Sequence, residues 1–186
     1  MRNLIVLMAA LGVSIAACNR APDVDLKNAS VEEVANKVAA AGSSDQFLNP
    51  GKWQTKVTVE DVSIPGMPPS QQAEMKRMFG QQNVVVDQCL TPEEARRPGG
   101  KFFTGKDAKD CRYDTFKMSG GKMEAVMQCQ GQGSGAMTLK VSGNYTPDNS
   151  TTRSEMTVSS GGQGSMTIKA LVEGRRIGEC EDKGKK

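Results

Sequence analysis

Cysteine is the residue type with the most chemistry to offer in this chain of 186 residues. Its five cysteines are Cys18, Cys89, Cys111, Cys129 and Cys180. Because five is odd, at least one sulfur stays outside any intramolecular disulfide. The chain has no histidine, which removes the commonest general base, the serine–histidine and cysteine–histidine nucleophile pairs, and the usual zinc and iron ligand sets. The cysteines therefore favour attachment of the chain and disulfide cross-linking over a catalytic role.

Cys18 directly follows an apolar run over residues 4–17. The run is too short to span a bilayer, which takes about 20 apolar residues, and it has the form of an export signal. Its last positions, Ile15-Ala16-Ala17-Cys18, resemble the bacterial lipobox, in which the chain is cut before the cysteine and the cysteine is acylated. We therefore expect a signal peptide over residues 1–17 and a lipidated N-terminus and tether over residues 18–29.

This attachment sets the expected location and the first predicted partner, a membrane. Two or more acyl chains hold a protein stably on a membrane without a spanning helix. Asn19 stands where an aspartate commonly marks retention in the inner membrane, so the resemblance favours the periplasmic face of the outer membrane. The formal net charge of +3 is too small to indicate a nucleic-acid partner.

The other four cysteines are expected to form two disulfides, because an exported domain folds in an oxidising compartment. Four cysteines allow three pairings, and a hairpin selects one of them. Folding the alternating segments on either side of Ser119-Gly120-Gly121 about Gly120 sets Cys111 opposite Cys129. The same register pairs Tyr113 with Met127, Thr115 with Ala125 and Lys117 with Met123. We predict Cys111–Cys129 from this hairpin and Cys89–Cys180 by elimination.

Helices and further strands must position these residues. Ser30 and Glu33 have the spacing of a capping box, and residues 30–48 are assigned to an amphipathic helix and a linker. A helix over residues 70–79 follows the loop "PGMPP", and Thr91-Pro92 begins a short third helix. Alternation predicts strands over residues 51–64, 83–90, 111–118, 122–129, 137–145, 153–158 and 166–172.

These elements predict an α+β domain over residues 49–180. Its main part is an antiparallel meander of about seven strands in a curved sheet, with two or three short helices on one face and two disulfides. The last residues, 181–186, are expected to form a disordered tail.

Acidic pairs and methionines are the remaining candidates for chemistry. Glu60-Asp61, Glu93-Glu94 and Glu181-Asp182 would serve a histidine-free hydrolase, but sequence neighbours point apart on a strand, so no catalytic residue is assigned. Thioethers bind Cu(I), which makes a periplasmic copper protein an alternative. The methionines at 123, 127, 137, 156 and 166 fall on inward positions, where methionine fills a core. No metal site and no cofactor is assigned.

Methionines on the helix and on the sheet could also line a binding site for an apolar ligand. The helix over 70–79 carries Met75, Met78 and Phe79 on one side, and the sheet offers Met127 and Met137 on its inward face. Either helix and sheet close on each other as a packed core, or they leave a pocket for an apolar ligand or a partner peptide.

Several short segments occur together in order: "PGKW", "IPGMPP", "CLTPEEA", "CRYDTFKMSGGKMEAVMQC", "SGNYTPD" and "RRIGEC". Over about residues 49–180 they resemble the bacterial family known as domain of unknown function 3617. The resemblance implies export, paired cysteines and a mainly β domain, and it carries no activity. The sequence thus indicates a membrane-anchored periplasmic lipoprotein that is not an enzyme and binds an apolar ligand or an envelope protein; the copper protein and the hydrolase are the alternatives.

Overall fold

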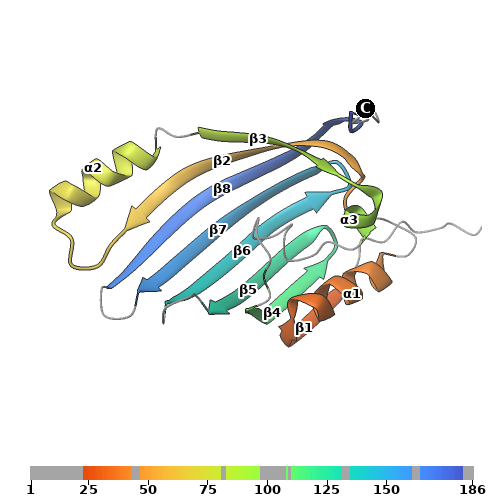
Figure 1. Ribbon diagram of the computed structural model, residues 1–186, viewed down its shortest axis with the longest axis horizontal. Coiled ribbons are helices and arrows are strands. Elements are labelled where there is room, and N and C mark those ends of the chain that lie inside the picture. The colour runs from red at the N-terminus through yellow and green to blue at the C-terminus, as the bar shows by residue number, and fades with distance from the viewer. Residues whose placement is uncertain are drawn as a thin grey trace, which may run out of the picture.

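The computed structural model describes residues 23–42, 47–80, 83–96, 108, 110–130, 135–160 and 164–181. Within these ranges the chain forms one sheet of eight strands with three helices (Figure 1). The strands are β1 (Val24–Ser30), β2 (Gly51–Ser63), β3 (Asn83–Leu90), β4 (Cys111–Ser119), β5 (Lys122–Gln130), β6 (Ala136–Thr146), β7 (Asn149–Ser160) and β8 (Gly164–Gly178). The helices are α1 (Val31–Ala41), α2 (Pro69–Gly80) and α3 (Pro92–Arg96).

The sheet is antiparallel throughout, in the order β1-β4-β5-β6-β7-β8-β2-β3. Strands β4 to β8 form the predicted meander, and β2 and β3 extend it beyond β8. The long central strands bend along their length (Figure 1). The predicted α+β class with a curved antiparallel sheet and two disulfides is confirmed.

Strand β1 corrects the prediction of a tether over residues 18–29. From Val24 the chain pairs with β4, and Val24 and Leu26 lie opposite Met118 and Phe116. The intervening polar residues point the other way, and Asp25 forms a salt bridge of 3.5 Å with Lys117. A strand forms here because the alternation, although short, packs two apolar side chains, the buried Val24 and the partly buried Leu26, against the cluster on β4. The folded unit therefore begins before residue 49.

The β4–β5 hairpin reaches the predicted cysteine pairing by a different route. Its turn has two residues, Gly120 and Gly121, with φ of 57° and 76°, as the tightest hairpin turns require. A bulge at Asp114 then shifts the register by one residue. The predicted pairs Cys111–Cys129 and Tyr113–Met127 are confirmed. The two pairs nearer the turn are wrong, because Thr115 lies opposite Val126 and Lys117 opposite Glu124.

Helix α1 covers one end of the sheet. Ser30 caps it as predicted, and its hydroxyl oxygen accepts a hydrogen bond from the Glu33 N–H at 3.1 Å. Val34 and Val38 are each 1% exposed and pack in the same buried cluster as the side chains of β1 and β4. The helix lies over β1 and β4 (Figure 1). Its burial, rather than its intrinsic propensity, stabilises a helix of this length.

Helix α2 does not lie over the sheet, which corrects the expectation that the helices share one face. It extends beyond the end of β2 (Figure 1), and none of its residues is buried. Two polar contacts hold it there. Lys76 forms a 3.0 Å salt bridge with Asp61, and the Gln72 side-chain amide donates to the Ile64 carbonyl at 2.9 Å. The hydrogen bond from Lys76 lowers the pKa of Asp61 below its ordinary value.

The two disulfides join Cys111 to Cys129 and Cys89 to Cys180, which are the predicted pairs. The first links neighbouring strands β4 and β5. The second links the edge strand β3 to the segment that follows β8, and β2 lies between these two strands. Helix α3 follows β3 directly and has the predicted cap, because Thr91 and Glu94 exchange hydrogen bonds through their side chains.

Candidate functional site

The two faces of the sheet differ in chemistry because most of its strands alternate between apolar and polar residues. We call the face that carries Phe116, Met127 and Trp53 the apolar face, and the opposite side the polar face. Side chains directly opposite each other in an antiparallel pair share a face. The registers therefore carry the apolar face across the whole sheet, from Phe116 on β4 to Val84 and Val86 on β3.

One part of the apolar face is fully covered. Its largest buried side chains are Phe116, Met118 and Met127, each at most 1% exposed. Aromatic rings pack edge-on within this cluster, with centroids 5.4 Å apart for Tyr113 and Phe116. The cluster belongs to β1, β4 and β5 with α1, and it extends to Trp53 and Leu90 at one end of the sheet. Methionine fills this core, as expected.

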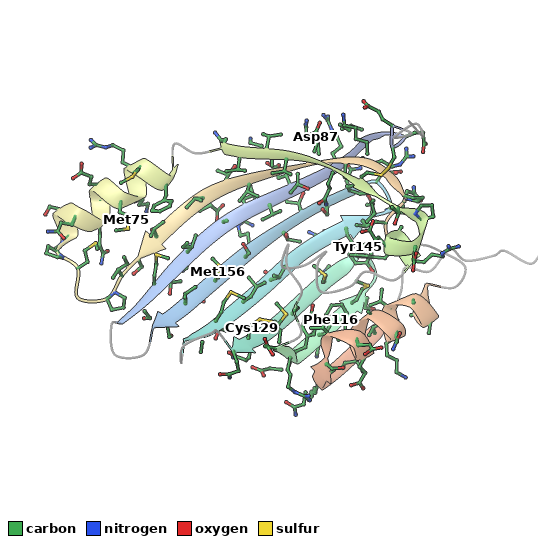
Figure 2. All side chains as sticks on the ribbon, viewed as in Figure 1. Met75, Asp87, Phe116, Cys129, Tyr145 and Met156 are labelled. Atoms are coloured by element: carbon green, nitrogen blue, oxygen red, sulfur yellow. A yellow bond between two sulfur atoms is a disulfide. The ribbon has the colours of Figure 1, made fainter. Side chains whose placement is uncertain are left out.

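Most of the remaining apolar face lies outside the buried cluster and is partly or fully exposed, although Val62 and Ala170 are buried. We call this region the open patch, and it consists of nine side chains on β2, β3, β7 and β8: Val57, Val59, Val84, Val86, Met156, Val158, Met166, Ile168 and Val172. Figure 2 shows Met156 near the middle of the sheet, away from both α1 and α2. Among the described helices none covers it.

One row of side chains shows how the covered and open regions meet. Cross-strand neighbours place Met127, Leu139, Met156, Ile168 and Val62 side by side across five strands. The two ends are buried, with Met127 at 1% and Val62 at 4% exposure, whereas Leu139, Met156 and Ile168 are partly exposed. At the ordinary strand spacing this row is about 19 Å long. The row is a continuous apolar track that is open in its middle.

The apolar face changes character along β7. Met156 and Val158 lie toward the turn into β8, whereas Ser150, Thr152 and Ser154 occupy the same face toward the other end. Tyr145 lies directly opposite Ser150 on β6, and its buried hydroxyl has no hydrogen-bond partner among the described residues. The apolar face thus has a purely apolar end and an end that carries hydroxyl groups.

The predicted ligand residues do not form one site. Met75, Met78 and Phe79 lie on α2 at one end of the sheet, and Met78 is 57% exposed. Met127 is buried in the cluster at the other end, and Met137 packs against that cluster. Figure 2 shows the separation, with Met75 on α2 and Cys129, two residues from Met127, near α1. Cys18, the predicted lipid site, lies outside the described residues.

Alternation alone predicts inward positions for Met156 and Met166 of the open patch, but it does not join them into a site. Met156, Met166 and Ile168 alternate with polar neighbours. What the pattern did not contain is the strand order. The pairing of β2 with β8 brings Val57 and Val59 beside Val172 and Ala170, which are far away in the sequence.

The polar face is a network of mutually neutralising charges. Lys140 and Lys169 both bind Glu155, at 3.0 and 3.5 Å, and Arg153 binds Glu60 at 3.7 Å. The hydrogen bond from Lys140 lowers the pKa of Glu155. A shallow hollow of about 460 Å³ lies over these residues. Because its cations and anions pair with one another, the hollow presents no net charge to attract an ionic ligand.

Three members of the acidic pairs have structural partners. Glu60 binds Arg153, Asp61 binds Lys76, and Glu94 caps α3, while Asp182 lies outside the described residues. In the described part of the chain, no three His, Cys, Asp or Glu side chains are grouped so that they would hold a metal ion. No helix within the described ranges is long and apolar enough to cross a membrane.

A family model described as protein of unknown function, DUF3617, matches residues 48–180. The chain belongs to this family. The part of the DUF3617 protein that matches runs from just before β2 to the end of β8 and includes the open patch and both disulfides, whereas β1 and α1 precede it. Neither a curated protein nor a solved structure matches the chain.

Proposed function

We propose that this DUF3617 protein is an exported, lipid-anchored protein of the bacterial envelope, held on the periplasmic face of the outer membrane, and that it binds an apolar ligand of the acyl-chain type on its open patch. The observation that carries the ligand is the apolar row from Met127 to Val62, which is buried at both ends and partly exposed between them. Extended apolar surface of this kind is typical of binding sites in proteins. The absence of histidine favours binding over catalysis.

The shape and chemistry of the open patch favour an acyl chain over a compact ligand. The row is long and narrow, at about 19 Å, and it offers apolar contact without a charged side chain. Flexible methionines at 156 and 166 adapt to a chain that has many conformations. The hydroxyl groups of Ser150, Thr152 and Ser154 lie at one end of the same face, where they suit the polar head of such a molecule.

A matched pair of variants tests the ligand. Met156→Lys places a charge in the middle of the row, whereas Thr157→Lys changes the next residue, which faces the polar side. We expect binding of a fluorescent fatty acid, cis-parinaric acid, to weaken at least about tenfold in Met156→Lys, a loss of about 1.4 kcal/mol. Thr157→Lys should bind as the unchanged protein does.

Thermal unfolding of both variants separates binding from folding. If Met156→Lys does not fold, Met156→Ser replaces it, because serine already occupies this face at 150 and 154. Equal affinity in the two lysine variants, or a purified protein that takes up no fatty acid and releases no lipid to organic solvent, would overturn the proposal.

The anchor is tested separately. Cys18→Ser should abolish incorporation of labelled palmitate and release the protein from the membrane fraction, because no acyl chain remains to hold it. Asn19→Asp should keep the palmitate and shift the protein toward the inner-membrane fraction. Palmitate labelling that persists in Cys18→Ser would contradict the anchor and leave the ligand proposal standing.

A further inference from the structure

The sheet has two edges, β1 and β3, and they are built differently. Natural proteins blunt an edge with charges, bulges or a covering helix, because an unpaired strand edge is a template for pairing. At β1 two of these devices are present, charges and a covering helix, and the backbone is also irregular. Asp25 and Lys27 carry charges, Asn28 adopts a positive φ of 51°, and α1 lies against the strand.

The β3 edge has none of these protections over its central residues. Val84, Val85 and Val86 are 47%, 53% and 48% exposed, and the strand contains no lysine, arginine or proline. One edge of β3 pairs with β2, and no described strand pairs with the other. The disulfide from Cys89 to Cys180 fixes one end of the strand. An apolar, unprotected edge that is fixed at one end is suited to strand addition.

We infer that β3 pairs with β3 of a second copy of this chain, antiparallel and about a two-fold axis that passes through Val85. This register keeps apolar residues opposite each other, because Val84 faces Val86 of the second copy. It also sets Asn83 opposite Asp87 of the second copy. Asn83 accepts from Thr58 through its amide oxygen at 3.2 Å, so its NH₂ group is available to donate to a carboxylate.

The charges on β3 select this register and favour a second copy over an unrelated strand. Asp87 is the only charged residue of the strand. A two-fold axis at Val85 holds the two Asp87 carboxylates four residue pairs apart, whereas an axis at Asp87 would set them side by side. The sequence Asn83 to Asp87 is therefore self-complementary, with an amide at one end, a carboxylate at the other and valines between them.

The consequence of this pairing is one sheet shared by two copies. A two-fold axis perpendicular to the sheet keeps the apolar faces on the same side. Val84 and Val86 belong to the open patch, so the two open patches meet at the axis and form one apolar surface. Because a strand edge buries less than the roughly 1,200–2,000 Å² of a standard interface, the dimer is expected to be weak and to exchange readily.

The test places charge on the two-fold axis. Val85 faces the polar side and is half exposed, so Val85→Lys and Val85→Glu are expected to fold, which thermal unfolding checks. Sedimentation velocity of the full chain in detergent, from low to high micromolar concentration, measures the mass. Thr151→Lys is the control, because Thr151 is an exposed polar-face residue on the central strand β7.

We expect a monomer–dimer equilibrium for the unchanged chain and for Thr151→Lys, and monomers for each Val85 variant alone. An equal mixture of Val85→Lys and Val85→Glu should restore the dimer, since lysine then lies opposite glutamate. A monomer at every concentration, a Val85→Lys variant that dimerises normally, a mixture that stays monomeric, or assemblies larger than a dimer would each overturn the inference. A protein that forms the dimer but binds no fatty acid would contradict the proposed ligand and leave the dimer inference intact.

Discussion

The covered and open halves of the sheet have the same sequence pattern and different surroundings. In β5 the burial alternates strictly, with Met123, Ala125, Met127 and Cys129 all buried. In β7 the equivalent side chains, Met156 and Val158, are only partly buried. Helix α1 lies over β1 and β4 beside β5, and Phe47 and Leu48 join the same buried cluster, whereas no described helix lies over β7 and β8. Alternation thus determines which side chains share a face, and a second layer determines whether they are buried.

The covered and open halves of the sheet are therefore expected to contribute differently to the free energy of unfolding. The covered half resembles an ordinary two-layer core, in which burial of each side chain stabilises the fold. The open half gains less from burial and is held by its strand pairing, its polar-face salt bridges and one disulfide. Four changes test this difference, from the largest expected effect to the smallest.

Removing the disulfide of the open half should have the largest effect. Cys89 and Cys180 are 91 residues apart, for which the chain-entropy model gives about 4.6 kcal/mol. The double change to serine should lower the free energy of unfolding by up to that amount in urea titrations. Hydrogen exchange should rise in β3 and β2 before it rises in β4, because the bond fixes the edge strand.

The matched control removes the disulfide of the covered half. Cys111 and Cys129 are 18 residues apart, which corresponds to about 3.2 kcal/mol. A larger loss for this pair than for Cys89 and Cys180 would mean that the covered half depends more strongly on its covalent bond, contrary to the comparison.

Truncation of one apolar side chain in each half measures the cover directly. Phe116 is fully buried, and Phe116→Ala should lower the free energy of unfolding by about 3–5 kcal/mol, since it removes contacts and leaves a cavity. Ile168→Ala should lower it by about 1 kcal/mol, because part of that side chain already contacts solvent. Equal losses in chemical denaturation would show that the open patch is packed as tightly as the core.

Alkaline pH should act on the covered half through its tyrosines, because both tyrosines of the chain belong to the buried cluster. Burial raises the pKa of Tyr113, and burial with the nearby Asp23 charge raises the pKa of Tyr145 to about 12. An unfolded tyrosine ionises near pH 10.

Above about pH 10 the unfolded chain therefore loses phenolic protons that the folded chain keeps, and stability falls as pH rises toward about 12. Below that range the stabilisation is fully present. Absorbance of the phenolate should appear together with unfolding, and Tyr145→Phe should reduce the pH dependence of the thermal midpoint. Phenolate absorbance near pH 10 in the folded protein would contradict the burial of these side chains.

The smallest expected effect is the loss of a helix cap. Ser30→Ala removes the hydrogen bond to Glu33 and should lower the free energy of unfolding by about 1 kcal/mol, because α1 covers the core. Ser70→Ala in α2 removes a hydroxyl from a helix that has no buried residue, so the thermal midpoint should stay within about a degree. A larger loss in Ser70→Ala would assign α2 a role in the core.

Much of this architecture could be predicted from local pattern. The strands, the caps at Ser30 and Thr91, and the inward positions of Met156 and Ile168 depend on residues close in sequence, where periods of 2 and 3.6 are informative. Strand β1 was missed because only four residues, Val24 to Lys27, alternate before Asn28 interrupts the pattern.

The candidate site could not be predicted in the same way, because it depends on which elements meet. Met75 and Met78 have helical spacing, but spacing does not say which surface a helix contacts, and α2 lies beyond β2. The neighbours of Ile168 come from strand order, which is set by pairing across more than a hundred residues in the case of Val62. The family model shows that residues 48–180 belong to DUF3617, but it assigns this region no activity.

The bulge at Asp114 has a consequence for how the first disulfide forms. With a two-residue turn and no bulge, Cys111 would lie opposite Gln130, and the two sulfurs would point to opposite faces of the hairpin. The extra residue in β4, whose carboxylate accepts a hydrogen bond from Gln128 at 3.1 Å, returns Cys111 to Cys129. The Cys111–Cys129 disulfide therefore forms only in hairpins that have the native register. In a variant that lacks Asp114, the yield of this disulfide would measure the fraction of hairpins that still bring Cys111 opposite Cys129.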